Sequence, residues 1–232
     1  MLVFTHYYYP EGNAPASRLR NLCAYWTEQG HDVRVITCVP HVPHGKAYQG
    51  YRNRFRQTEE IDGVRVTRVW TYLTANKGTL GRIVNFLVYM FMAVFFAMFM
   101  RKPDIVVATS PQFFCGWAGL IVSKFRLWKM PFILEIRDMW PDSIVAVGAM
   151  NNKRLLAILY KLEKWLYRGA DHIVTVGEGY REDLIDKRVP EDIISVIPNG
   201  VDKSLFKPLD ADRRRHDGHG SGKPLTCAYV GT

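Results

Sequence analysis

The stretch that decides the fold is Pro131-Phe132-Ile133-Leu134-Glu135-Ile136-Arg137-Asp138-Met139-Trp140-Pro141-Asp142-Ser143. It begins with a short apolar run, and a strand buried on both faces of a parallel sheet typically reads as such a run. Four charged residues, a tryptophan and a proline then follow or interrupt that run where the strand should end. Because ligands of open α/β sheets bind beyond the carboxyl ends of the strands, the segment predicts a binding site.

Strand and helix patterns alternate on both sides of this stretch. Strands are expected at residues 2–5, 33–38, 64–70, 104–109, 132–136, 172–176 and 193–197. Helices are expected at residues 16–29, 83–100, 113–128, 152–168 and 178–187, whereas residues 41–60 are polar, aromatic and expected to be irregular. The alternation implies right-handed crossovers, so the predicted fold class is α/β, with a parallel sheet and helices on both faces.

Size and composition suggest one domain followed by the beginning of another. The chain has 232 residues, of which 48% are hydrophobic. We expect one domain over residues 1–202, a polar and charged linker over residues 203–224, and the first strand of a truncated second α/β domain over residues 225–232.

The charge balance points to anionic partners. The formal net charge is +9 at pH 7, which favours phosphate ligands, an anionic membrane face or nucleic acid. The arginine run at 213–215 has no nucleic-acid-binding motif beside it, so no nucleic-acid partner is expected. The four cysteines lie far apart in the sequence, which indicates a reduced cytoplasmic protein without a disulfide framework.

The first turn between a strand and a helix is Tyr7-Tyr8-Tyr9-Pro10-Glu11-Gly12-Asn13-Ala14-Pro15. The dinucleotide fingerprint G-x-G-x-x-G is absent, which argues against a nicotinamide-dependent enzyme. Glu11, Gly12 and Asn13 still precede a helix start, where free N–H groups and the helix dipole favour a phosphate. The alternative is a simple turn in which Asn13 caps the helix.

Two further turns are candidate binding segments. Arg137 offers a planar fork for phosphate or carboxylate, and Asp138 could accept from a sugar hydroxyl. The alternative is that these two side chains pair with each other. Asn199, Gly200 and Asp202 form a sharp turn after the last strand, which is either the wall of a cleft or a plain turn.

Residues 83–100 form a long apolar helix that Asn85 alone interrupts. The helix is about 27 Å long, close to the thickness of a bilayer core. A spanning helix would separate the strands before it from those after it. We therefore expect either a helix that covers the sheet or one whose outer face enters the membrane interface. Basic residues beside it and on the helix at 152–168 favour peripheral membrane association.

No metal site is predicted, because the seven histidines lack acidic or cysteine partners at ligand spacing. No cofactor is expected either.

Taken together, these segments resemble the family-4 glycosyltransferases of the GT-B fold, in particular the bacterial branch that builds colanic-acid-type and O-antigen-type polysaccharides, including fucosamine transferases. The matching segments follow one another through nearly the whole chain: Tyr8-Tyr9-Pro10-Glu11-Gly12, Gly30-His31-Asp32-Val33, Val35-Ile36-Thr37, Gly45-Lys46, Tyr48-Gln49-Gly50-Tyr51, Glu60-Ile61-Asp62-Gly63-Val64, Asn76-Lys77-Gly78, Arg137-Asp138-Met139-Trp140-Pro141-Asp142-Ser143 and Ile197-Pro198-Asn199-Gly200-Val201-Asp202. Each segment alone is a weak signal, whereas the ordered set is specific.

The resemblance implies the Rossmann-like, acceptor-side domain of a retaining, metal-independent enzyme that transfers a sugar from a nucleotide-sugar donor to a glycan acceptor. It places the loop at Gly12 near the donor diphosphate, Arg137 and Asp138 along the cleft, and Asn199, Gly200 and Asp202 at the hinge between domains. Many relatives carry a histidine near the position of Arg137, so the role of that arginine is open. The catalytic residues are expected in the second domain, so the fragment alone should not catalyse.

The apolar, basic surface fits a lipid-linked acceptor at the inner face of the cytoplasmic membrane, in bacterial surface polysaccharide synthesis. The competing interpretation is a membrane-anchored binding module without enzymatic activity.

Overall fold

The computed structural model describes residues 1–74, 79–110, 112–125, 129–146, 148, 150 and 152–200. The chain divides into two compact units, Met1–Pro198 and Asn199–Thr232, and the fold described here is that of the first unit. The predicted boundary after residue 202, the linker at 203–224 and the strand at 225–232 lie outside the described residues.

The first unit alternates strands and helices along the chain. The strands are β1 (Leu2–Phe4), β2 (Arg34–Cys38), β3 (Arg56–Ile61), β4 (Val64–Val69), β5 (Val106–Thr109), β6 (Phe132–Ile136), β7 (His172–Thr175) and β8 (Ile194–Val196). The helices are α1 (Ala14–Glu28), α2 (Thr79–Met98), α3 (Phe113–Phe125), α4 (Asp142–Ala146), α5 (Lys153–Gly169), α6 (Glu178–Asp186) and the 3-10 turn η1 (Glu191–Ile193).

The strands form one sheet in the order β3-β4-β2-β1-β5-β6-β7-β8. All neighbouring pairs are parallel except β3 and β4. The predicted α/β class is confirmed, but the prediction of an irregular segment as far as residue 60 is wrong at β3. Asp62 and Gly63 have φ of 52° and 74°, and two left-handed residues in a row make the tight turn of a β-hairpin.

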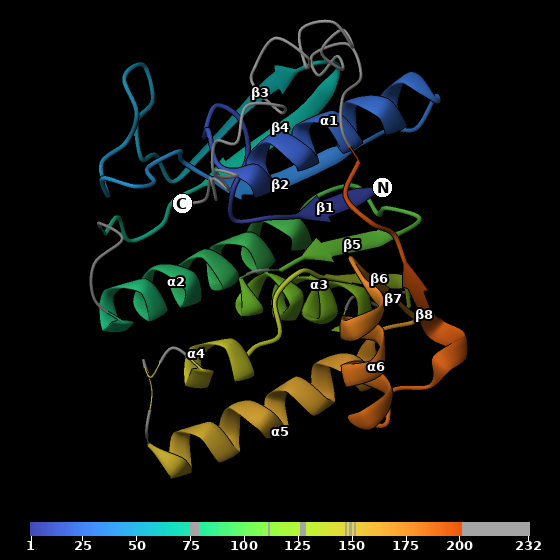
Figure 1. Ribbon diagram of the computed structural model, residues 1–232. Helices are drawn as coiled ribbons and strands as arrows, with labels where there is room; N and C mark the ends of the chain where they lie inside the picture. Colours follow the sequence, from blue (N-terminus) through green and yellow to red (C-terminus); the bar gives the residue numbers. More distant parts are fainter. Residues whose placement is uncertain are drawn as a thin grey trace, which may run out of the picture. The chain divides into compact units, whose positions relative to one another are not determined.

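The direction of the crossovers decides which face each helix covers. The chain moves one way along the sheet from β1 through α1 to β2, and the opposite way through α2, α3, α5 and α6. Right-handed connections that run in opposite directions lie on opposite faces of a sheet. Figure 1 shows α1 on one side and α2, α3 and α5 on the other. Helices therefore cover both faces, as predicted, but very unequally in the described chain.

Helix α3 lies unusually close to the centre of the sheet. A methyl group added at Gly119 would come within 2.7 Å of the Phe132 ring and 2.8 Å of the Ala108 side chain. Glycine therefore permits the close approach of α3 to β5 and β6. This packing holds α3 against the two strands whose carboxyl ends carry the candidate site.

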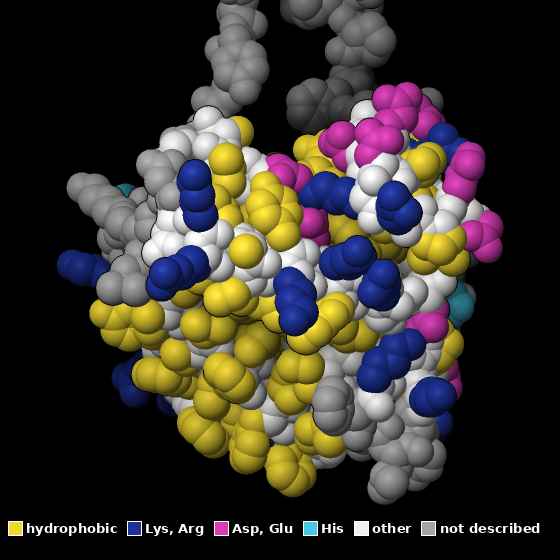
Figure 2. Space-filling view, turned by 90° about the horizontal axis from the view of Figure 1, so that it is seen from below, with side chains coloured by type: hydrophobic (Ala, Val, Ile, Leu, Met, Phe, Trp, Pro, Cys, Tyr) yellow, Lys and Arg dark blue, Asp and Glu magenta, His cyan; other side chains and the backbone are white. Residues whose placement is uncertain are grey.

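Helix α2 has one buried and one exposed face. Tyr89 is fully buried, and its hydroxyl lies 2.9 Å from the carbonyl oxygens of both Thr5 and Ile36. On the opposite side Phe91 and Phe99 are 65% and 75% exposed. The prediction of a helix that covers the sheet is confirmed. Figure 2 shows hydrophobic side chains gathered on this side of the molecule, with Lys and Arg side chains beside them.

Within the described chain, Gly81–Met98 is the one helical window long and apolar enough to cross a membrane by length and composition. A third of that window is buried inside the protein, and core helices of soluble proteins meet the same criterion.

Candidate functional site

The candidate site lies where the topology of the sheet reverses. Strand β1 is central, with β2 on one side and β5 on the other, and the connections that follow β1 and β5 lie on opposite faces. A crevice forms at such a point beyond the carboxyl ends of the strands, where ligands of open α/β sheets bind. The loops after β1, β2, β5 and β6 all end at this edge.

Two arginines converge there on one carboxylate. Arg18, from the second turn of α1, reaches Glu135 of β6 with 2.5 Å between Nη2 and Oε2. The same nitrogen lies 3.4 Å from Oγ1 of Thr109, at the end of β5. The guanidinium of Arg137 approaches the other oxygen of Glu135, at 3.7 Å. The cluster therefore joins α1, β5 and β6.

This cluster has an excess positive charge in a partly desolvated place. The Arg18, Glu135 and Arg137 side chains are only 22%, 11% and 15% exposed. Burial, and then the charge of Arg18, lower the pKa of Arg137 below its ordinary value. Nε of Arg18 is buried without a hydrogen-bond partner in the described protein. A phosphate would supply both a counter-charge and acceptor oxygens to this cluster.

The turn after β6 is held in place by Ser110. Its hydroxyl oxygen accepts from the backbone N–H groups of Arg137 at 2.7 Å and Asp138 at 3.2 Å. The Asp138 carboxylate in turn accepts from the Ser143 hydroxyl at 3.2 Å. Arg137 thus pairs with Glu135 while Asp138 contacts Ser143, so the alternative in which the two pair with each other is wrong. Burial raises the pKa of Asp138.

Glu11 has a scaffolding position. Its Oε1 accepts from the backbone N–H groups of His41 at 2.9 Å and Val42 at 3.0 Å, and its side chain is 2% exposed. Burial raises the pKa of this carboxyl, and the hydrogen bonds from His41 and Val42 oppose the shift. Glu11 therefore ties the loop after β1 to the loop after β2.

Asn13 and Gly12 occupy the entry to α1. The Asn13 side chain accepts from the N–H of Ala16 at 3.0 Å, which makes Asn13 the cap of the helix. Gly12 is exposed, and an added methyl group would meet nothing within 4 Å. The open side of Gly12 leaves room for a ligand to approach the loop.

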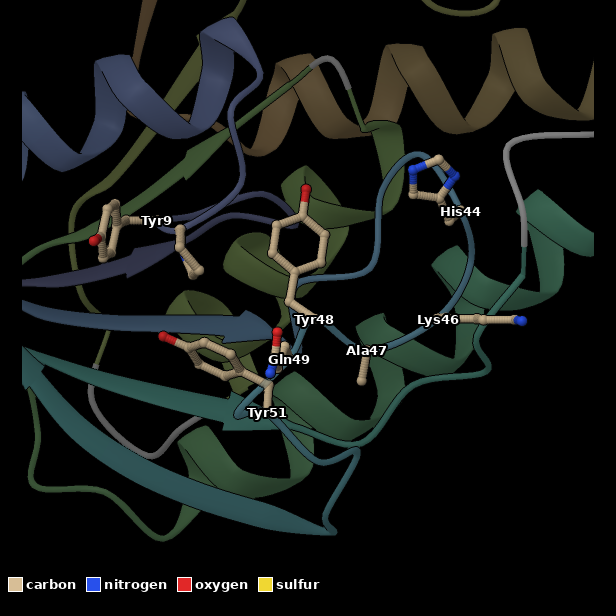
Figure 3. Close-up of a pocket in the computed structure, with 8 residues that line it drawn as sticks. Tyr9, His44, Lys46, Ala47, Tyr48, Gln49 and Tyr51 are labelled. Carbon is tan, nitrogen blue, oxygen red and sulfur yellow. The ribbon is translucent and has the colours of Figure 1, made fainter.

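An open pocket of about 860 Å³ adjoins this loop, between Tyr9-Pro10 and the segment that follows β2. Figure 3 shows the rings of Tyr9, Tyr48 and Tyr51 around the hollow, while Lys46 extends away from them. The Tyr48 hydroxyl donates to the carbonyl of Val42 at 2.6 Å, which fixes that ring. Rigid aromatic rings beside polar groups suit the apolar faces and hydroxyl edges of a sugar.

Arg68 supports two walls of this pocket. It is 2% exposed, and it donates to the carbonyls of Cys38 at 3.0 Å and Tyr9 at 2.5 Å. It also pairs with Glu59, and its guanidinium lies 4.9 Å from the centre of the Tyr51 ring. One side chain of β4 thereby positions Tyr9 and Tyr51.

The remaining predicted residues belong to the second unit. Asn199 and Gly200 are exposed and have no regular secondary structure, and Asp202 lies outside the described residues. Their predicted role at a hinge stays a prediction, as does the binding role of the other predicted residues.

Sequence reasoning included Glu135 in the strand-end segment that predicts a site, but it missed Arg18 and the tyrosine pocket. Glu135 stands out in the sequence because it is a charged residue inside the apolar run of β6. The turn of α1 next to the first loop was a weaker signal for Arg18. Tyr48 and Tyr51 gave no chemical signal, because their position beside Tyr9 depends on the long connection between β2 and β3.

The described part of the chain holds no group of three or more His, Cys, Asp or Glu side chains that could bind a metal ion.

Two solved structures of HepE from Anabaena are similar in outline. The complex with UDP has a TM-score of 0.48, and the complex with UDP and glucose has a TM-score of 0.49, both at 15% sequence identity. The matches cover 93% and 94% of this chain and 49% and 50% of the HepE chains.

Sequence comparison gives the family. The putative colanic acid biosynthesis glycosyl transferase WcaI of Escherichia coli K12 is 24% identical over 218 residues, which are 91% of this chain and 53% of WcaI. The chain thus spans about half the length of this relative. The family described as the glycosyl transferase 4-like domain matches residues 13–200, which include α1 and all the strands from β2 to β8. The chain belongs to this glycosyl transferase 4-like family.

Proposed function

We propose that this chain forms the acceptor-side part of a glycosyltransferase that transfers a sugar from a nucleotide-sugar donor to a glycan acceptor, with retention at the anomeric carbon. The observation that carries the proposal is the pair Arg18 and Arg137 around Glu135 at the reversal point of the sheet. Family membership over residues 13–200 supports the reaction class.

The chemistry of sugar transfer explains the value of such a cluster. Cleavage of the bond between the sugar and the nucleotide diphosphate develops negative charge on the leaving phosphate. Guanidinium groups that are already desolvated stabilise that charge more strongly than they would in water. Arg18 and Arg137 would act in this way, as binding and positioning groups for the diphosphate, while Glu135 holds both in place.

The tyrosine pocket would hold the acceptor. Tyr9 and Tyr51 offer ring faces, and Gln49 and His44 offer polar atoms at the rim. The likeness to WcaI supports an acceptor in bacterial surface polysaccharide synthesis, and a lipid-linked glycan fits the exposed aromatic face of α2.

The same proposal places the protein at the inner face of the cytoplasmic membrane, attached peripherally. Phe91 and Phe95 are exposed on α2, Phe99 is exposed just after its end, and Arg101 and Lys102 come two residues later. Aromatic side chains flanked by cations bind the interface of anionic bilayers.

The test is transfer activity of the complete gene product. Membrane-derived lipid-linked acceptors are incubated with a panel of radiolabelled uridine and guanosine diphosphate sugars, and label entering the lipid fraction is counted. Incorporation from one donor, with an axial or equatorial linkage that matches the donor anomer by NMR, supports the proposal.

The competing module without enzymatic activity makes the opposite prediction. It would bind membranes but neither consume a nucleotide sugar nor bind a nucleoside diphosphate in calorimetry. That combined result would sink the glycosyltransferase proposal.

A further inference from the structure

A second cavity opens on the face of the sheet opposite to α1, between α5 and the segment that joins α6 to β8. Its volume is about 520 Å³. Ala170 and Ile193, which line it, immediately precede or adjoin the amino ends of β7 and β8. The candidate site for sugar transfer lies at the carboxyl ends of the strands, so this cavity is separate from it.

One buried carboxylate in the cavity is paired with a lysine. Glu163 is 4% exposed, and its Oε1 accepts from Nζ of Lys187 at 2.6 Å and from the hydroxyl of Tyr167 at 2.9 Å. The same Nζ lies 2.5 Å from the carboxylate of Asp142. Lys187 is shared by two carboxylates, so these three groups together carry one net negative charge, which the other cations of the cavity outnumber.

Three other cations line the cavity without such compensation. Lys164, Arg168 and Arg188 are exposed, and none of them forms an ion pair within the described chain. Arg188 has a φ of 64°, in the left-handed region that favours glycine or asparagine at a helix end. The sequence thus places a guanidinium at a backbone position where a smaller residue would fit better.

The surroundings of the cavity are apolar as well as cationic. Val189 and Pro190 contribute to its lining, and on the outer side of α5 Ile158 and Trp165 are 56% and 50% exposed. Nζ of Lys161 lies 5.1 Å from the centre of the Trp165 ring. Helix α5 faces the viewer in Figure 2, where Lys and Arg side chains form a band across this face.

We propose that this cavity binds a phosphate ester, held by Lys164, Arg168 and Arg188. Guanidinium forks bind phosphate oxygens in pairs, and the apolar lining suits the body of an ester rather than a bare ion. The site does not depend on sugar transfer and would exist in a protein without that activity. The ester is carried either by a membrane phospholipid or by a soluble metabolite.

Calorimetric titration separates the two sources. The purified protein is titrated with monomeric dihexanoyl phosphatidylglycerol and, separately, with glycerol 3-phosphate. The double variant Arg168→Gln/Arg188→Asn removes two cations at exposed positions, and asparagine suits the left-handed backbone. The matched control Lys153→Gln/Arg154→Gln removes two cations from the exposed first turn of the same helix.

The expected result is saturable binding of at least one probe. Affinity should fall about tenfold or more in Arg168→Gln/Arg188→Asn and stay within about twofold in the control, because only the first pair contacts the phosphate. Binding of the lipid alone assigns the ester to a phospholipid headgroup, and binding of glycerol 3-phosphate assigns it to a soluble ester. Absence of saturable binding, or equal losses in both double variants, would overturn the site.

Discussion

Arg18 and Arg137 share the single carboxylate of Glu135, and this arrangement gives the carboxyl edge of the sheet its chemistry. A lone arginine beside a lone glutamate would be a closed ion pair with little left for a ligand. Two arginines on one glutamate leave the cluster one positive charge in excess. Glu135 thus acts as a positioning residue that orients both guanidinium groups.

Replacing Arg18 by glutamine tests this cluster. If Arg18 stabilises the leaving diphosphate, kcat/KM for the nucleotide sugar should fall by about 100-fold, as expected for the loss of one preorganised donor to developing charge. The measurement is steady-state kinetics of the complete gene product. Arg65→Gln removes an exposed arginine from β4 and serves as the control. Unchanged kinetics in Arg18→Gln would contradict the assignment.

Asp138 gives a prediction about pH and stability. Burial raises the pKa of Asp138 above the ordinary 3.8, so the folded protein holds this proton more tightly than the unfolded chain. The resulting stabilisation is present below pH 3.8 and is lost as the pH rises through the folded-state pKa. Asparagine can still accept from Ser143 but does not titrate.

The Asp138→Asn variant should therefore gain in Tm relative to the wild type as the pH rises from 3.8, and the difference should then level off. Thermal unfolding followed by circular dichroism between about pH 4 and 8 measures it. A difference in Tm that is constant across this range would mean that the pKa of Asp138 is not shifted by folding. A difference that shrinks with rising pH would mean that folding lowers this pKa.

At the scale of elements, the two faces of α2 differ in their contacts. Its inner face carries the buried Tyr89, which anchors the helix to the residue after β1 and to the middle of β2. Asn85, also buried, donates to the carbonyl of Tyr72 at 2.6 Å and lies 3.4 Å from Nε2 of His41. The exposed rings on the outer side contribute less: Phe95 packs edge-on against Phe96 at the border of the core, at 5.3 Å between ring centres.

Removing those aromatic side chains should weaken membrane binding but not folding. The variant Phe91→Ser/Phe95→Ser/Phe99→Ser loses three exposed rings, each worth roughly 1.5–3 kcal/mol if fully buried in lipid. Cosedimentation with vesicles that contain phosphatidylglycerol should drop at least about tenfold, with Tm lowered by no more than a few degrees.

Tyr25→Ser provides the matched control, because Tyr25 is 56% exposed on α1, on the other face of the sheet. Vesicle binding of the triple variant at the level of this control would mean that α2 does not enter the interface.

At the scale of the whole molecule, the net charge of +9 predicts a salt-sensitive attachment. Each lysine or arginine near an anionic leaflet contributes about 1 kcal/mol, and salt screens this term within about 10 Å at 0.1 M. Vesicle binding should therefore weaken steeply between about 0.05 and 0.5 M NaCl. The apolar contribution of α2 should leave measurable vesicle binding at high salt. Binding that is independent of salt would instead indicate a purely apolar attachment.

Much of the fold could be predicted from the sequence, because buried parallel strands are recognisable as short apolar runs. The strand at residues 132–136 was predicted with the bounds of β6. β3 was not predicted, since an edge strand that alternates half-buried and exposed side chains has no continuous apolar run. The left-handed turn at Asp62 and Gly63 reverses the chain, and this reversal makes β3 antiparallel to β4.

The site could be predicted only as a region. The turn at Arg137 and Asp138 was identified because charge follows an apolar strand at a known edge of the sheet. The partners of these residues could not be assigned, because Arg18 reaches Glu135 across 117 positions of sequence. The sequence carries no record of which side chains the crossovers bring together.

Glu11 has a practical consequence for any alanine survey of the first loop. Glu11→Ala would leave the backbone N–H groups of His41 and Val42 without their acceptor, and two loops would separate. The resulting loss of activity would resemble that of a catalytic acid, although in the structure Glu11 accepts from two backbone N–H groups. Glu11→Gln keeps an oxygen for both donors and should retain activity within about threefold. That result would show that Glu11 supports the two loops and does not need to titrate.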